Sequence, residues 1–226
     1  MGAFNTPKFA KIKFVLMDVE GTTTDIDFVK NVLFPYSAQE LRQFVNDHFS
    51  ERRLQICLET MGQKDMERAI EQLHAWIRQD VKHPALKTIQ GFIWKKGYET
   101  NAFKSHVYED VVKAWKKWLE HGIKLGIYSS GSIESQRLLF SHSEQGNLLP
   151  FIDAHFDLST GPKRDPKSYF DIARALKLPT QEILFLSDVV EELDAAKETE
   201  FFTAQIVRSG TMPTDRHPCF KTFLNI

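Results

Sequence analysis

The feature that most constrains the fold is a series of short apolar runs, each followed at once by a polar residue. The runs are residues 12–17 before Asp18, 123–128 before Ser129, 183–186 before Ser187 and Asp188, and 202–207 before Arg208, with a weaker run at 155–158. Such runs are typical of strands buried on both faces of a parallel sheet. The sequence therefore predicts a central parallel sheet whose strands end in polar side chains.

Helical patterns separate the later runs. Apolar residues recur at helical spacing at Val107, Val111, Trp115 and Trp118, with Gly122 as a stop, and at Tyr169, Ile172 and Leu176 after Pro166. Strands that alternate with helices favour right-handed crossovers and helices on both faces of the sheet. We therefore predict an α/β fold with a Rossmann-like, doubly wound parallel sheet.

About a hundred residues between the first two runs carry only helical periodicity, for example at Ile70, Leu73, Ile77 and Val81. We interpret residues 26–105 as a helical cap inserted after the first strand, and residues 1–25 plus 106–226 as the core. An insertion at this point lies over the carboxyl ends of the strands, where ligands bind in such sheets, and could act as a lid.

Composition excludes several classes of protein. The chain has 226 residues with 29 basic and 30 acidic side chains, so the net charge gives no reason to expect a nucleic-acid partner. The two cysteines fit neither a disulfide framework nor a zinc site, which favours the cytosol. No apolar run is long enough for a membrane span. Gly2 formally fits a myristoylation pattern, but that pattern is loose, and we expect no lipid anchor.

The strongest local signal is the pair of carboxylates after the first strand, Asp18 and Glu20, followed by Gly21. One carboxylate can attack phosphorus while its neighbour protonates the leaving oxygen and later activates water. The alternative is a pair of turn-forming acids before a glycine. The spacing alone leaves both interpretations open.

A third acid, Asp188, follows another predicted strand and would meet the first two at one edge of the sheet. Three converging carboxylates need a cation, and oxygen ligands favour Mg²⁺ over zinc. Alternatively, Asp188 caps a helix over residues 189–198. We expect Glu191, Glu192 and Asp194 to lie in the solvated first turns of that helix.

A phosphate site is predicted near the other strand ends. Ser129 and Ser130 close the second strand and open a helix, where hydroxyls and N–H groups hold anions. Lys163 lies in a turn-rich loop and could offset the negative charge, although Arg164 and Lys167 compete for that role. Because the chain lacks both a phosphate-loop lysine and a Gly-x-Gly-x-x-Gly motif, we reject a nucleoside triphosphatase and a dehydrogenase.

In this order, the motifs resemble the haloacid dehalogenase superfamily. The matching residues are Asp18, Glu20, Ser129, Lys163 and Asp188. The block over residues 18–36, together with Gly91-Phe92-Ile93-Trp94, His106-Val107-Tyr108 and Phe185-Leu186-Ser187-Asp188, closely resembles the enolase-phosphatases of methionine salvage. The resemblance spans nearly the whole chain. Departures are Asn101, where that family is expected to carry glycine, and the stretch 164–167.

The resemblance implies a magnesium-dependent acireductone synthase that enolises 2,3-diketo-5-methylthiopentyl-1-phosphate and then removes the phosphate. By analogy, Asp18 is the nucleophile and Glu20 the acid/base, Ser129, Ser130 and Lys163 bind phosphate, and Asp18, Glu20 and Asp188 form the metal site. The enolisation base is harder to assign, and Glu20 is our candidate. We expect a cytosolic monomer. The alternatives are a sibling phosphatase for another small metabolite and a catalytically silent binding module.

Overall fold

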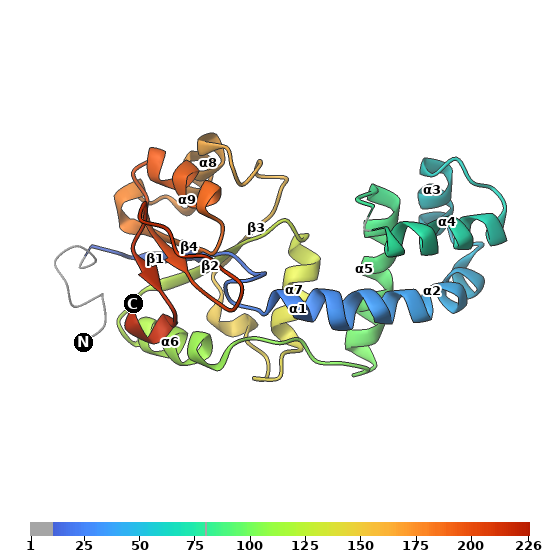
Figure 1. Ribbon diagram of the computed structural model, residues 1–226, viewed down its shortest axis with the longest axis horizontal. Coiled ribbons are helices and arrows are strands. Elements are labelled where there is room, and N and C mark those ends of the chain that lie inside the picture. Colours follow the sequence, from blue (N-terminus) through green and yellow to red (C-terminus); the bar gives the residue numbers. More distant parts are fainter. Residues whose placement is uncertain (1–10, 80) are drawn as a thin grey trace. The chain divides into compact units, whose positions relative to one another are not determined.

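The computed structural model describes residues 11–79 and 81–226, so Gly2 and its lipidation motif lie outside the described residues. The chain divides into two compact units. The first joins the chain up to Ile26 with Ser105–Ile226, and the second is Asp27–Lys104. Figure 1 shows a sheet flanked by helices in the first unit and only helices in the second.

The first unit is built on a six-stranded parallel sheet in the order β3-β2-β1-β4-β5-β6. The strands are β1 (Phe14–Met17), β2 (Lys124–Tyr128), β3 (Ala154–Phe156), β4 (Ile183–Ser187), β5 (Phe202–Ile206) and β6 (Cys219–Phe220). The order reverses at β1, so the chain winds outward on both sides of it. This arrangement confirms the α/β fold with a doubly wound sheet and a helical insertion.

Helices cover both faces of this sheet. Four long helices follow the strands in alternation: α6 (Glu109–Glu120), α7 (Ile133–Ser141), α8 (Pro166–Leu176) and α9 (Val190–Glu198). On β1, Val15 and Met17 pack with side chains of α6 and α7, whereas Phe14 and Leu16 pack with α8 and α9. Successive side chains of a strand point to opposite faces, so one buried strand serves two apolar cores (Figure 1).

Several predicted boundaries are corrected. The weak strand lies at Ala154–Phe156 rather than 155–158, because Asp157 starts a turn in which its side chain accepts the amide of Ser159 at 2.9 Å. Val207 follows β5, and Val107 precedes α6. The two-residue strand β6 was not predicted, since so short a segment shows no periodicity.

The second unit consists of helices around its own apolar core. It begins within α1 (Ile26–Phe28), and its further elements are a π-helical turn (Val29–Leu33), α2 (Phe34–His48), α3 (Arg52–Thr60), α4 (Met66–Arg78) and α5 (Pro84–Glu99). Ile70 and Leu73 of α4 are fully buried, but Val81 lies beyond the end of that helix. Asn101 has φ 55°. After glycine, asparagine tolerates this left-handed backbone best. Asparagine can therefore occupy a position where glycine was expected.

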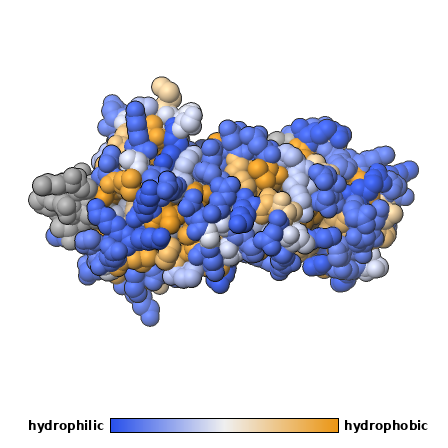
Figure 2. Space-filling view, turned by 90° about the horizontal axis from the view of Figure 1, so that it is seen from below, coloured by the Kyte–Doolittle hydropathy of each residue, from blue (hydrophilic) through white to orange (hydrophobic). Residues whose placement is uncertain are grey.

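Polar side chains dominate the face drawn in Figure 2, with apolar side chains interspersed among them. Within residues 11–79 and 81–226, no helix combines the length and apolar character needed to cross a membrane.

Candidate active site

The carboxyl edge of the sheet brings the polar ends of the strands together. Met17 of β1 pairs with Ile127 of β2 and Leu186 of β4. Because the strands are parallel, the residues that follow them emerge at the same edge. Asp18, Ser129 and Asp188 therefore share this edge.

Thr22 connects two of the carboxylates. Its Oγ1 lies 3.2 Å from Asp18 Oδ2 and 3.2 Å from Asp188 Oδ1, and it accepts the Asp188 amide at 3.0 Å. Gly21 makes this approach possible: it has φ +78°, and a Cβ there would lie 2.5 Å from Asp188 Oδ2. A glycine after the paired acids is thus a geometric requirement of the site.

Lys163 is the buried cation of the site. Its ammonium donates a hydrogen bond to Asp18 Oδ1 and lies 2.7 Å from Glu192 Oε2, and the three side chains are 8%, 7% and 11% exposed. Burial alone would lower the pKa of Lys163, but the two carboxylates outweigh burial and raise it, so the side chain is an ammonium ion.

Two tyrosines hold the loop that carries Lys163. The Tyr128 hydroxyl donates to the Gly161 carbonyl at 2.9 Å, and the Tyr169 hydroxyl donates to the Lys163 carbonyl at 2.7 Å. The competing cations of this loop point elsewhere: the side chains of Arg164 and Lys167 are 70% and 77% exposed. Of these three cations, only Lys163 is positioned to act on Asp18.

The prediction that Glu192 lies in a solvated turn is wrong. Its carboxylate is buried, accepts the Ser187 hydroxyl at 3.0 Å and pairs with Lys163. Burial raises the pKa of Glu192, and the negative charge of Asp18 raises it further. The Lys163 ammonium acts in the opposite direction but is shared between the two carboxylates, so the net shift is upward. A signal was present in the sequence: Ala195 and Ala196, three and four residues on, mark the buried face of α9.

The other predicted residues are more exposed or bonded locally. The Ser129 hydroxyl is buried and accepts the Gly131 amide at 3.1 Å, whereas Ser130 is exposed at the same strand end. Glu20 is also exposed, in the turn that follows Asp18. Asp188 does not cap α9, because Val189 occupies the N-cap position. The structure thus joins Asp18, Lys163 and Asp188 in one hydrogen-bonded cluster.

The donor set fits a magnesium ion. Burial, followed by the negative charge of Asp18, raises the pKa of Asp188 to about 6. The carboxylates of Asp18 and Asp188 therefore repel each other, and a bound cation would relieve this repulsion. Within the described residues, no three His, Cys, Asp or Glu side chains form a ready metal cage. Mg²⁺ does not need one, because it commonly takes one or two carboxylates and keeps several waters. Asp18 and Asp188 are two carboxylates of this kind at one edge of the sheet.

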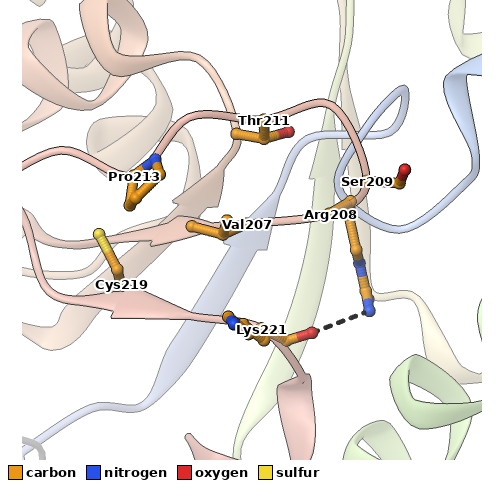
Figure 3. Close-up of a pocket in the computed structure, with 7 residues that line it drawn as sticks. All are labelled: Val207, Arg208, Ser209, Thr211, Pro213, Cys219 and Lys221. Carbon is orange, nitrogen blue, oxygen red and sulfur yellow. Dashed lines mark hydrogen bonds between the residues drawn. The ribbon is translucent and has the colours of Figure 1, made fainter.

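A pocket of about 500 Å³ lies beyond the end of β5 (Figure 3). Its lining residues are Val207, Arg208, Ser209, Thr211, Pro213, Cys219 and Lys221. No carboxylate lines it, and it is separate from the Asp18 cluster. Arg208 links the two places, since its Nε donates to the Thr22 carbonyl at 3.2 Å.

The haloacid dehalogenase-like hydrolase model matches residues 12–199. Enolase-phosphatase E1 of Pseudomonas aeruginosa (strain UCBPP-PA14) is 44% identical over 95% of this chain and 98% of its own length. Enolase-phosphatase E1 of Picosynechococcus sp. is 45% identical over 91% of this chain and 94% of its own.

Solved structures agree with this result. The UTR4 protein of Saccharomyces cerevisiae superposes with a TM-score of 0.84 at 32% identity, over 95% of this chain and all of that one. L-2-haloacid dehalogenase of Xanthobacter autotrophicus has a TM-score of 0.58 at 17% identity over 95% and 96% of the two chains, which shows the shared fold alone. By fold, motif order and near full-length identity, this chain belongs to the haloacid dehalogenase-like hydrolases and, among them, to the enolase-phosphatase E1 family.

Proposed function

We propose that this chain converts 2,3-diketo-5-methylthiopentyl-1-phosphate to 1,2-dihydroxy-3-keto-5-methylthiopentene and phosphate, the enolase-phosphatase step of methionine salvage. Family membership supports the reaction, at 44% identity over 95% of the chain. The observation that carries the chemistry is the buried Lys163 ammonium on the carboxylate of Asp18, beside Asp188. A nucleophile and a fixed positive charge at one strand edge suit phosphoryl transfer.

In the phosphoryl step, an Asp18 oxygen attacks phosphorus. A bond forms between carboxylate and phosphorus, the bond from phosphorus to the substrate oxygen breaks, and Glu20 gives that oxygen a proton. Glu20 then takes a proton from water, which attacks phosphorus, releases phosphate and restores Asp18. The Lys163 ammonium is held at Asp18, where it offsets the charge of the incoming phosphate.

Asp18, Glu20 and Asp188 would hold Mg²⁺, which when bound neutralises phosphate charge and stabilises an enolate oxygen. Ser129, Ser130 and Lys163 would bind the phosphate oxygens. Ser130 is exposed two residues before the N-cap of α7, Ser132, and a helix N-terminus favours a bound anion. The roles of these residues are part of the proposal.

Enolisation needs a base near a carbon next to a carbonyl, and we assign this role to Glu20 because it is the exposed carboxylate nearest in sequence to Asp18. The helical unit Asp27–Lys104 would act as the cap that selects the methylthio end and excludes water. We also propose a cytosolic monomer. Cys57 and Cys219 form no disulfide, as is usual in a reducing compartment.

The test is an anaerobic reaction of the diketo phosphate with Mg²⁺, in which released phosphate and the ultraviolet absorbance of the enediol product are followed together. We expect both signals to rise. Asp18→Asn should lower phosphate release by at least about 10³-fold, because an amide is a poor nucleophile. Asp153→Asn is the matched control, since Asp153 lies just before β3 at the opposite edge and bonds the Leu125 amide.

Phosphate release from simple phosphoesters without turnover of the diketo phosphate would favour the sibling phosphatase. Undiminished phosphate release by Asp18→Asn would remove Asp18 as the nucleophile.

A further inference from the structure

Arg208 has a largely buried side chain, and the proposed reaction has so far assigned it no role. It follows β5, and its side chain is 9% exposed. Its Nε donates to the Thr22 carbonyl at 3.2 Å, and its Nη1 lies 3.1 Å from Asp110 Oδ2 and 3.4 Å from the Lys221 carbonyl. Figure 3 shows the side chain extending from its loop toward that carbonyl.

The surroundings of Arg208 fix its guanidinium in one orientation. The guanidinium carbon lies 4.0 Å from the ring centroid of Tyr108 and 5.4 Å from that of Phe223. Asp110 is fixed in turn, because it accepts the Thr222 hydroxyl and the Phe223 amide, each at 2.8 Å. Both members of the ion pair are thus held by groups outside the pair.

This burial has a cost that stability alone does not explain. The Nη2 of Arg208 is buried and has no hydrogen-bond partner within the described residues. A buried donor without a partner destabilises the fold. An arginine placed here at this cost is therefore a candidate for a role in function.

The residue that Arg208 contacts is the one that joins the two carboxylates of the site. The carbonyl of Thr22 accepts from Arg208, while the hydroxyl of the same residue bonds Asp18 and Asp188. A shift of the Thr22 main chain would move this hydroxyl and change the direction of both carboxylates. Misplacement by about 1 Å at a reacting group can cost about 10²-fold in rate.

We propose that Arg208, oriented by Asp110, is a positioning residue that fixes the main chain at Thr22 and thereby the attack geometry of Asp18. The inference rests on the proposed role of Asp18 as nucleophile. Arg208 bonds neither Asp18 nor Asp188, and it acts on them only through Thr22. A lysine could not reproduce this role, because its single ammonium lacks the planar fork that reaches both Thr22 and Asp110.

The experiment compares Arg208→Lys with wild type on the diketo phosphate and on a simple aryl phosphate, with inorganic phosphate as a competing ligand. We expect kcat to fall about 10- to 100-fold on both substrates, while KM and the inhibition constant of phosphate stay within about twofold. Lys221→Ala is the matched control. Its side chain lines the same pocket, but Arg208 contacts only its carbonyl, so kcat should not change.

Thermal melting of each variant is measured alongside. A folded Arg208→Lys protein with wild-type kcat would overturn the proposal, as would a parallel loss of kcat and phosphate binding. If Arg208→Lys melts below the assay temperature, Asp110→Asn replaces it, since asparagine still accepts the Phe223 amide but does not pair with Arg208 as an ion. For Asp110→Asn we expect a smaller fall in kcat than for Arg208→Lys, again without a change in KM or phosphate binding. An unchanged kcat would refute the proposal.

The two substrates separate this inference from the proposed function. A wild-type protein that hydrolyses only the aryl phosphate contradicts the methionine-salvage assignment and leaves the Arg208 comparison intact. A wild-type protein inactive on both removes Asp18 as nucleophile, and the Arg208 inference fails with it.

Discussion

The core of the helical unit and the carboxyl edge of the sheet are both buried, but they differ in chemistry. Among the described residues of Asp27–Lys104, the buried polar side chains are Ser37 and Gln90, and these bond each other at 3.3 Å. The sheet edge buries a larger polar group, comprising Asp18, Thr22, Thr23, Thr24, Ser129, Lys163, Ser187 and Glu192. One region removes apolar surface from water, whereas the other holds charges in fixed places.

The difference shows where stability and function reside in this chain. An apolar core gains stability from each methylene that it buries. At the edge, two carboxylates share the Lys163 ammonium, an arrangement whose desolvation offsets most of its attraction. Substitutions in the helical core should therefore change stability, and substitutions at the edge should change rate.

The largest effect is expected from Ile70→Ala in α4, where the side chain is fully buried. The lost contacts and the cavity should lower the free energy of unfolding by about 2–5 kcal/mol, and Ile70→Val should cost about 0.5–1.5 kcal/mol. Urea denaturation measures both changes. Below the melting temperature, kcat should remain near the wild-type value. A large fall in kcat in the folded variant would contradict the prediction that the helical core affects stability and not rate.

Gly21→Ala tests the edge with one methyl group. The new Cβ would lie 2.5 Å from Asp188 Oδ2 at a backbone φ of +78°. We expect kcat/KM to fall by about 100-fold, equivalent to about 2.7 kcal/mol of transition-state stabilisation. Steady-state phosphate release gives this value.

Gly62→Ala in the helical unit is the matched control, because Gly62 has φ +71° and open space around it. Backbone strain should lower its stability by about 1–2 kcal/mol, with no loss of rate. Equal losses of rate in the two variants would show that strain, rather than contact with Asp188, controls activity.

Glu192→Gln should lower kcat by about 10-fold and leave the melting temperature nearly unchanged. The amide still accepts hydrogen bonds but gives Lys163 one carboxylate fewer, which weakens the hold on the ammonium. Glu191→Gln, one residue earlier and 58% exposed, should match wild type. If the two variants had the same kcat, Glu192 would have only a structural role.

The sequence predicted the regular parts of the fold because their signals are local. A buried strand such as Phe14–Met17 is readable from its own residues. The strand Cys219–Phe220 is not, since it exists only through pairing with Gln205 and Ile206, far away in sequence. Asn101 was noted as a departure, but only its φ of 55° explains it.

At the site, the same contrast separates what was predicted from what was missed. Asp18 and Asp188 follow strands, so the sheet itself places them. Sequence could not choose Lys163 over its neighbours, because that loop is held by the hydroxyls of Tyr128 and Tyr169, and these side-chain contacts leave no sequence pattern. Arg208 was noted only as the polar residue after a predicted strand, and its role could not be predicted because its partners come from three separate segments of the chain.

The smallest expected effect is a pH dependence of stability that differs between the sheet unit and the helical unit. Burial, then the charge of Arg137, lowers the pKa of His155 on β3 from 6.5 to about 4. Because the folded state disfavours the charged ring, this stability is present above pH 6.5 and is lost as pH falls toward 4. Solvent screening of the half-buried ring limits the contribution to about 1 kcal/mol.

Replacing His155 with glutamine should remove that part of the pH dependence, so the stability of His155→Gln should fall less than that of wild type between pH 6.5 and 4. His74 of α4 is the matched position in the helical unit. Burial there also lowers the pKa, but the ring is less enclosed, so His74→Gln should flatten the curve less. Urea midpoints at several pH values measure both differences. A larger flattening by His74→Gln would contradict this prediction and mean that acid sensitivity arises mainly in the helical unit.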